Sequence, residues 1–136
     1  MKERDARDLV AKARVARVGT IDERGRVHLV PIVYVVDGDT LYSSTDAGDR
    51  PAKRLRNLET NPSVTILVDV YDEEWSKVWW VRLRGTGRVV EEGPEHAHAY
   101  RLLREKYPQY ESEPVGGPVM AVDVAEWAGW AYSGGG

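Results

Sequence analysis

The sequence contains no cysteine, which excludes disulfide bonds, thiolate metal ligands and a cysteine nucleophile. No apolar run is long enough to cross a bilayer. Residues 1–8 are mostly charged and lack the apolar stretch of a signal peptide. We therefore expect a cytoplasmic protein that has no membrane partner.

Positive charge is not in excess either, because the formal net charge is −3 at pH 7. This balance argues against nucleic acid as a partner. Among the three histidines, His96 and His98 are two residues apart on a predicted helix, so their side chains face different directions. The sequence therefore predicts no metal site. No Ser-His-Asp set stands in a supporting context, and no catalytic side chain can be named.

The 136 residues, of which 42% are hydrophobic, suffice for one domain with a real core. We assign this domain to residues 1–132 and expect the glycine-rich tail, 133–136, to be disordered. Hydrophobic periodicity predicts helices over 3–14, 51–60 and 94–106, and strands over 15–21, 26–36, 40–45, 63–71, 77–91 and 118–125. This order of elements favours a mainly β protein, an antiparallel barrel with peripheral helices.

Glycine and proline refine the predicted strands. Proline cannot donate to a strand ladder, so Pro31 indicates an edge strand or a bulge. Asp37 and Gly38 form a two-residue hairpin signal. Gly85 and Gly87 indicate bulges or bends within the long strand 77–91.

The strongest functional signal lies between residues 40 and 62. Ser43 and Ser44 end a predicted strand, and the first turns of the following helix carry Lys53, Arg54 and Arg56. Free N–H groups and the dipole at a helix N-terminus favour an anion, and lysine and arginine add charge-assisted hydrogen bonds. Cations are disfavoured at this end of a helix, and a bound phosphate would remove the conflict. The alternatives are a solvated helix face and hydroxyls that bond nearby backbone.

The order of these features resembles the flavin-binding split-barrel superfamily, which includes pyridoxamine 5′-phosphate oxidases and coenzyme F420-dependent reductases. The resemblance rests on a strand, hydroxyls, a turn, a basic pair, the Asn-Leu and Asn-Pro of residues 57–62, and a further apolar strand. It extends upstream over 16–34 and downstream over 79–90. Trp79-Trp80 and the segment 126–130 are most similar to the probable F420-dependent branch.

The resemblance implies a six-stranded split β-barrel of Greek-key type and a homodimer with two cofactor sites across its interface. It implies that Ser44 is the phosphate-binding hydroxyl and that Lys53 and Arg54 form the basic pair. The family order of this pair, Arg-Lys, is reversed here, so which of the two contacts the phosphate stays open. Arg54 is the strongest single candidate. Lys106, on the predicted helix 94–106, is expected to lie away from this site.

The resemblance also implies contacts to the cofactor ring. Pro31, Ile32 and Val33 would run along the ring, although an ordinary buried strand with an edge proline explains the same pattern. Trp80 would lie at a subunit interface or cofactor pocket, since adjacent strand residues face opposite ways. Trp127 would lie near the cofactor of the partner subunit. Core and interface packing explain both tryptophans equally well.

The function implied is that of an oxidoreductase that transfers a hydride between F420 and an unknown small organic acceptor. Such an enzyme holds the acceptor over the cofactor ring and needs little side-chain chemistry. The alternatives are an FMN-dependent enzyme similar to pyridoxamine 5′-phosphate oxidase, and a non-catalytic flavin- or haem-binding barrel. For haem, His28 is the only strand histidine available. Five tryptophans and seven tyrosines in one small domain support a homodimer.

Overall fold

The computed structural model describes residues 1–45, 52–111 and 116–132. These residues form one antiparallel sheet in the order β2-β1-β5-β6-β7-β4-β3. Its strands are β1 (Ala16–Ile21), β2 (Val27–Ile32), β3 (Val35–Asp37), β4 (Thr40–Ser44), β5 (Ser63–Val70), β6 (Trp79–Val90) and β7 (Val119–Ala131). The helices are α1 (Glu3–Lys12), α2 (Lys53–Thr60) and α3 (Pro94–Lys106), with short 3₁₀ turns at Trp75–Lys77 and Pro108–Glu111.

The predicted fold class, mainly β and antiparallel with three helices, is confirmed. The described sheet has seven strands rather than six, because the predicted strand 26–36 is divided at Val33 and Tyr34. The carbonyl of Val33 accepts a hydrogen bond from the Ser43 hydroxyl at 2.9 Å. The N–H of Tyr34 donates to the Tyr107 hydroxyl at 3.2 Å. Side chains thus replace ladder partners here, and the chain passes from one end of the sheet to the other.

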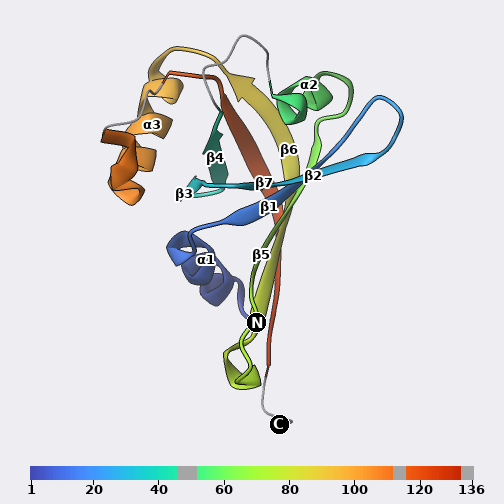
Figure 1. Cartoon of the computed structure of the whole chain (residues 1–136), viewed down its shortest axis with the longest axis vertical. Helices are drawn as coiled ribbons and strands as arrows, with labels where there is room; N and C mark the ends of the chain where they lie inside the picture. Colours follow the sequence, from blue (N-terminus) through green and yellow to red (C-terminus); the bar gives the residue numbers. More distant parts are fainter. Residues whose placement is uncertain (46–51, 112–115, 133–136) are drawn as a thin grey trace.

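β6 and β7 pair along their whole length and run with β5 away from the barrel (Figure 1). The register shifts between Arg84 and Gly85, which confirms the bulge predicted there. A Cβ at Gly85 would lie 2.1 Å from the carbonyl oxygen of Asp123, so only glycine permits this approach. The last strand was predicted to end at 125. It continues to Ala131 because β6 offers a pairing partner as far as Trp79.

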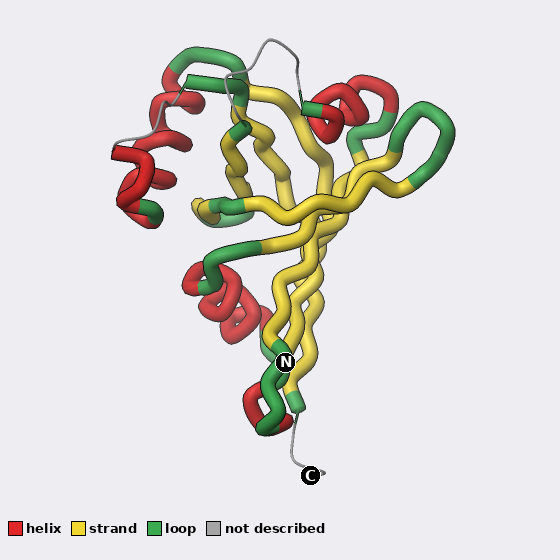
Figure 2. The backbone as a smooth tube through the Cα atoms, viewed as in Figure 1, coloured by secondary structure: helices red, strands yellow, loops and turns green. Residues whose placement is uncertain are grey.

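The three helices lie around the outside of the sheet (Figure 2). α1 and α2 pack with the apolar inner faces of β1, β5 and β6 in the main core, around Val18, Ile66 and Leu83. α3 packs on the opposite side of β4 and β7 in a second cluster that contains Tyr100 and Val119. α3 has the bounds predicted for it, while α1 ends two residues early at Lys12. The predicted start of the second helix and the tail 133–136 lie outside the described residues.

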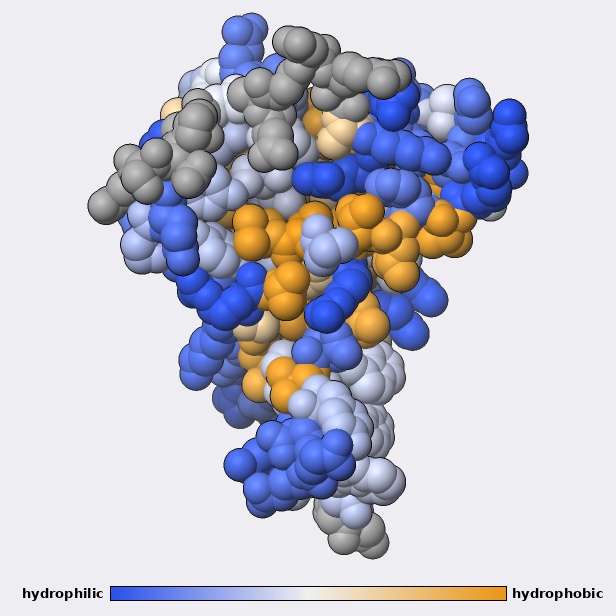
Figure 3. Space-filling view, viewed as in Figure 1, coloured by the Kyte–Doolittle hydropathy of each residue, from blue (hydrophilic) through white to orange (hydrophobic). Residues whose placement is uncertain are grey.

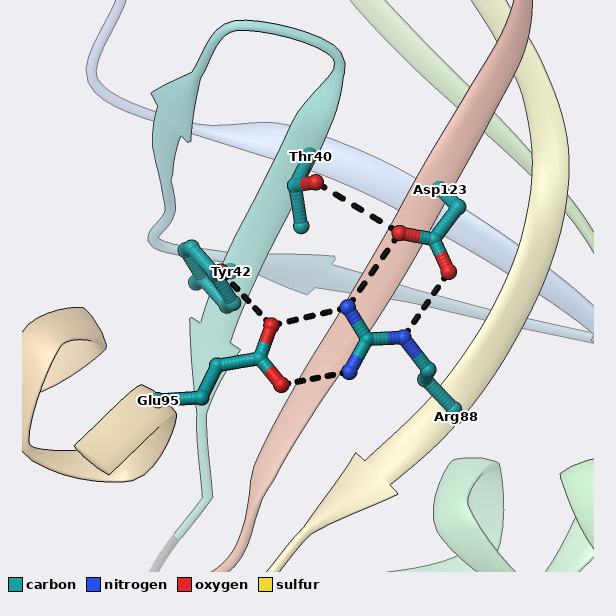
Figure 4. A network of polar contacts seen from close by, with 5 residues as sticks. All are labelled: Thr40, Tyr42, Arg88, Glu95 and Asp123. Atoms are coloured by element: carbon teal, nitrogen blue, oxygen red, sulfur yellow. Dashed lines mark hydrogen bonds and ion pairs between the residues drawn. The ribbon is translucent and has the colours of Figure 1, made fainter. Parts of the chain in front are cut away.

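A charged network fastens the first turn of α3 to the sheet (Figure 4). The Arg88 guanidinium donates to both carboxylate oxygens of Glu95, at 2.6 and 2.8 Å, and to those of Asp123, at 2.8 and 3.2 Å. The Tyr42 hydroxyl donates to Glu95 at 2.8 Å, and Thr40 contacts Asp123 at 3.4 Å. The bond to Arg88, followed by the bond to Tyr42, lowers the pKa of Glu95 to about 2. Helix α3 therefore meets the sheet through bonded charges as well as apolar packing.

Candidate cofactor site

The end of β4 meets the start of α2 through a contact between Arg54 and Ser44. The Arg54 guanidinium donates to the Ser44 carbonyl at 3.1 Å. The Ser44 hydroxyl forms a hydrogen bond with the Tyr110 hydroxyl. The turn between β4 and α2, residues 46–51, lies outside the described residues. The strand end and the basic helix start that the sequence singled out are thus adjacent in space.

The hydroxyls at the end of β4 have different surroundings because successive strand residues face opposite sides. Ser43 is buried, and its hydroxyl is used by the Val33 carbonyl. The Thr45 hydroxyl donates to the Pro118 carbonyl at 2.6 Å. These two hydroxyls donate to backbone carbonyls. This agrees with the alternative considered above, in which the hydroxyls at the strand end serve only to bond backbone. Ser44 instead bonds another hydroxyl, and this leaves it the best placed of the three to contact a ligand.

The cations of α2 are divided between two directions. Arg54 turns toward β4, whereas the Lys53 amine lies 3.7 Å from the carboxylate of Asp22. Arg56 is exposed and lines a polar pocket of about 270 Å³ together with Lys53 and Asp22. The three predicted cations therefore do not converge on a single point within this chain.

His28 on β2 is close enough to Lys53 and Arg54, at the start of α2, for their charges to act on it. It pairs with Thr20 of β1, whose hydroxyl accepts a hydrogen bond from the Asn57 side chain at 3.0 Å. Nδ1 of His28 is buried and has no hydrogen-bond partner among the described residues. Burial lowers the pKa of His28, and the charges of Lys53 and Arg54 lower it further.

Tyr110 and His28 were not identified as phosphate-site residues by sequence reasoning. Tyr110 is 66 residues from Ser44, in a segment predicted as loop that forms the 3₁₀ turn Pro108–Glu111. No periodicity marks such a distant contact. For His28 a signal was available, because it lies on the strand that the resemblance places beside the cofactor ring.

The predicted ring-binding segment lies at the edge of the sheet. Pro31 lies on β2, the strand at one end of the described sheet order, and pairs there with Arg17 of β1. This confirms the edge position expected from its missing N–H. The Ile32 side chain is buried in the core. Val33 is partly exposed, and its carbonyl is bonded to Ser43.

Trp79 and Trp80 face opposite sides of β6, as predicted. Trp79 packs against the core, and both tryptophans line a hollow of about 410 Å³ together with Arg82. Trp127 packs against the core near α1, with the Arg7 guanidinium 4.4 Å from the centre of its ring. Along β7, Trp127 is eight residues from Val119, the pairing partner of Ser44, which corresponds to about 26 Å. A single chain therefore does not bring Trp127 to Ser44.

The outer face of the sheet carries an apolar surface. Val27 is 71% exposed and Leu29 is 64% exposed, and Leu67 and Trp130 are also exposed. Hydrophobic side chains form a band across the middle of the molecule (Figure 3). Contiguous exposed apolar patches are typical of interaction surfaces in proteins.

Lys106, on α3, is a largely buried cation and not an exposed one. Its amine is buried without a hydrogen-bond partner among the described residues and lies 4.0 Å from the centre of the Tyr34 ring. Burial, with the charge of Arg14 next, lowers the pKa of Lys106 to about 8. A change at Lys106 would therefore disturb packing, and other residues serve better as controls.

A sequence profile described as pyridoxamine 5′-phosphate oxidase matches residues 3–131. The chain belongs to this family. The match covers every element from α1 to β7, including the Ser44–Arg54 contact. No curated protein sequence matches the chain significantly.

Several solved structures share the fold of this chain. A conserved hypothetical protein of Mycobacterium tuberculosis aligns with a TM-score of 0.81 at 21% identity, covering 96% of this chain and 85% of that one. A FAD-binding protein of Mycobacterium smegmatis aligns at 0.70 with 22% identity, covering 97% of each chain. The heme storage protein of Vibrio cholerae aligns at 0.72 with 17% identity, covering 95% of this chain and 93% of that one. At sequence identities this low, the likeness shows a shared fold only.

Two further findings concern the described residues. Among the described residues, no three His, Cys, Asp or Glu side chains lie close enough to hold a metal ion. None of the described helices is long and apolar enough to span a bilayer.

Proposed function

We propose that this protein is an oxidoreductase that transfers a hydride between the deazaflavin coenzyme F420 and a small organic acceptor. The observation that carries the proposal is the contact between Arg54 and Ser44 at the start of α2, in a chain of the pyridoxamine 5′-phosphate oxidase family. The preference for F420 over FMN rests on the resemblance of Trp79 and Trp80 to the F420-dependent branch.

The start of α2 suits a phosphate group. Ala52 precedes the helix and provides no side-chain cap, and the first turn holds no acidic residue. The first turn instead begins with Lys53 and Arg54, which the helix dipole disfavours. A phosphate would accept hydrogen bonds from free helix N–H groups and offset this repulsion. The residues present therefore fit the phosphate of a flavin or deazaflavin.

The cofactor would supply the hydride chemistry, and the chain would hold and orient it. We assign the phosphate to Arg54 and Ser44, with Lys53 and Arg56 as nearby cations. The edge of β2 from Pro31 to Val33 would lie along the ring. This division of roles requires no side-chain nucleophile.

The proposal includes a homodimer with cofactor sites at its interface. Leu29 and Val27 expose apolar surface on the outer side of the sheet, which a second copy would cover. Trp80 lies on that same side. Because Trp127 is far from Ser44 along β7, it would reach a cofactor bound at Ser44 only if that cofactor belonged to the partner subunit.

Two alternatives have support from similar folds. FMN as cofactor is favoured by the family description and by the FAD-binding protein of similar structure. A non-catalytic haem-binding role is favoured by the heme storage protein of similar structure.

Calorimetric titration with F420 and FMN, side by side, tests the proposal. We expect F420 to bind at least tenfold more tightly, a difference of ~1.4 kcal/mol. Equal or tighter binding of FMN would overturn the choice of F420. If neither binds, the oxidoreductase proposal fails. A Soret band after addition of haem would then favour the haem-binding alternative.

A further inference from the structure

We propose that His28 is an additional ligand of the cofactor's phosphate group and that it takes up a proton when the phosphate binds. This inference rests on the proposed function, since it assigns a role at the same site. It adds a residue that neither the sequence motif nor the family resemblance assigns to the phosphate.

The position of His28 supports this role. β2 carries it on the same face of the sheet as Thr20, and Thr20 is bonded to Asn57 of α2. His28 is close enough to Lys53 and Arg54 for both charges to act on it. The imidazole therefore lies within electrostatic range of Lys53 and Arg54, two of the predicted phosphate ligands.

The hydrogen bonds of His28 are incomplete. Nδ1 is buried and has no hydrogen-bond partner among the described residues. A buried nitrogen without a partner is costly, and native proteins seldom leave one unless a ligand or water completes it. The other histidines differ, since His96 contacts the Gly117 carbonyl at 3.0 Å and His98 contacts Asp37 at 2.7 Å. Among the three histidines, His28 is the one with a vacant buried nitrogen.

The charges that face His28 are Lys53 and Arg54 from α2 and Asp22 from the β1–β2 turn. Asp22 would favour the protonated imidazole, but its carboxylate is already engaged. It accepts backbone N–H bonds from Arg24 and Arg26, both at 2.9 Å, and pairs with the Lys53 amine at 3.7 Å. His28 therefore stays neutral at pH 7 while no anion is bound, since burial and the two cations lower its pKa.

A bound phosphate would reverse this balance. Its negative charge would offset Lys53 and Arg54 and would accept a hydrogen bond from the imidazolium. The pKa of His28 would rise, and binding would take up a proton. The affinity for the phosphate-bearing ligand should then fall as pH rises above 6.5. A phosphate monoester ionises fully only above about pH 6, so the clearest window is pH 6.5–8.

Nuclear magnetic resonance can follow this directly, because the chain has three histidines. The pKa of each imidazole is measured in the free protein and with FMN, F420 and inorganic phosphate. Riboflavin, which lacks the phosphate, is the ligand control, and His96 and His98 are internal references. Binding of FMN and F420 is also measured from pH 6.5 to 8 in the wild-type protein and in the variants His28→Gln and His96→Gln.

We expect FMN, F420 and inorganic phosphate to raise the pKa of His28 by about two units or more, and riboflavin to leave it unchanged. The affinity of the wild-type protein and of His96→Gln for each cofactor that binds should fall about tenfold over the pH window. That of His28→Gln should change less than twofold. A thermal melt checks that His28→Gln is folded, and the titration of wild-type His28 does not depend on that variant.

Other outcomes separate this inference from the function. If a flavin or F420 binds and His28 does not shift, or if riboflavin shifts it equally, the phosphate role of His28 is wrong and the oxidoreductase proposal stands. If inorganic phosphate shifts His28 while neither cofactor binds, the anion site stands and the proposed function falls. If nothing binds, both are overturned.

Discussion

Arg54 is the side chain on which the candidate site depends most. It connects α2 to β4 through the Ser44 carbonyl and lies beside the Ser44 hydroxyl and its partner Tyr110. A guanidinium keeps its charge at every physiological pH and offers several donors in a fixed plane. It can therefore hold the strand end and still donate to a phosphate.

Replacing Arg54 with alanine should weaken cofactor binding. Loss of one charge-assisted contact costs ~1.5–3 kcal/mol, so affinity should fall roughly 10- to 150-fold. Calorimetry measures the affinity, and a urea melt confirms that the variant is folded. Arg4→Ala, an exposed position on α1, is the control and should bind normally. A folded Arg54→Ala protein with unchanged affinity would contradict the assignment, and Lys53 would be tested next.

Lys106 allows a second test at the residue scale. Its folded-state pKa, about 8, lies below the value near 10.4 expected for an unfolded chain. Between these values the unfolded state binds more protons, so stability should rise with pH across this window. Lys106→Met keeps the packing over Tyr34 without the charge. It should be more stable than the wild type at pH 7 and show no such rise.

Urea unfolding at pH 7 and pH 9.5 measures this difference. Burial raises the pKa values of Tyr34 and Tyr107 in the folded chain. The highest pH is therefore kept at 9.5, where neither tyrosine ionises in the folded protein. Lys12→Met, at an exposed position on α1, serves as the control. A wild-type stability that does not rise between the two pH values would show that the Lys106 amine is not held in this buried state.

At the scale of elements, α3 owes its position to two kinds of contact. One side packs through Tyr100 and Leu103, and its first turn is bonded through Glu95 to Arg88. Glu95 also lies where the helix dipole favours a negative charge. The charged contacts should therefore make the attachment of α3 sensitive to acid.

We expect the free energy of unfolding to fall as pH drops from 4.5 toward 2. The pKa of Glu95 is about 2 in the folded chain and near 4.5 when unfolded, so its contribution is complete above 4.5 and is lost below it. Asp123 adds in the same direction. Glu95→Gln should lower stability at pH 7 by about 1 kcal/mol, a modest figure because the side chain is 36% exposed.

The acid dependence should also be weaker in Glu95→Gln than in the wild type. Urea melts from pH 7 to pH 2.5 compare the two. Glu105→Gln, at an exposed position on the same helix, is the matched control and should follow the wild type. Identical pH profiles for wild type and Glu95→Gln would mean that the network does not contribute to stability.

Sequence patterns predicted the elements better than their ends. The bounds predicted for α3 agree with the structure, because a glycine followed by a proline is typical of a helix start and stands here at residues 93 and 94. The strand over 118–125 was predicted too short, since the alanines and glycine of 125–131 are weak strand formers and only pairing with β6 extends it. The division at Val33 was missed because it depends on Tyr107 and Ser43, which are remote in sequence.

The difference between local and remote contacts also decides how much of the candidate site could be predicted. Ser44 and Arg54 are ten residues apart, and a strand followed by a helix start brings them together by local geometry. Tyr110 and His28 come close to them only through contacts between segments that are remote in the sequence. Their roles toward a cofactor stay predictions, as do those of Trp80 and Trp127.

At the scale of the whole molecule, the outer face of the sheet is the basis for the oligomeric state that we propose. Val27 and Leu29 lie on the edge strand β2, which is a hazard for a monomer unless it is covered. A standard interface buries about 800 Å² on each partner. We propose a second copy as the cover.

Light scattering at micromolar concentration should show a dimer for the wild-type protein. Leu29→Glu should be largely monomeric, because it places a charge in the centre of the proposed interface. Val15→Glu, an exposed apolar position before β1, is the control and should remain dimeric. A monomeric wild-type protein would contradict both the dimer and the shared cofactor site.

The pairing of β4 with β7 joins Thr40 to Asp123, which are far apart in the chain. During synthesis the ribosome must release β7 before β4 finds its neighbour, and contacts between distant segments form slowly. Ser44 pairs with Val119 at this same seam. A cofactor phosphate held at Ser44, as proposed above, would therefore find its site complete only after β7 has emerged from the ribosome.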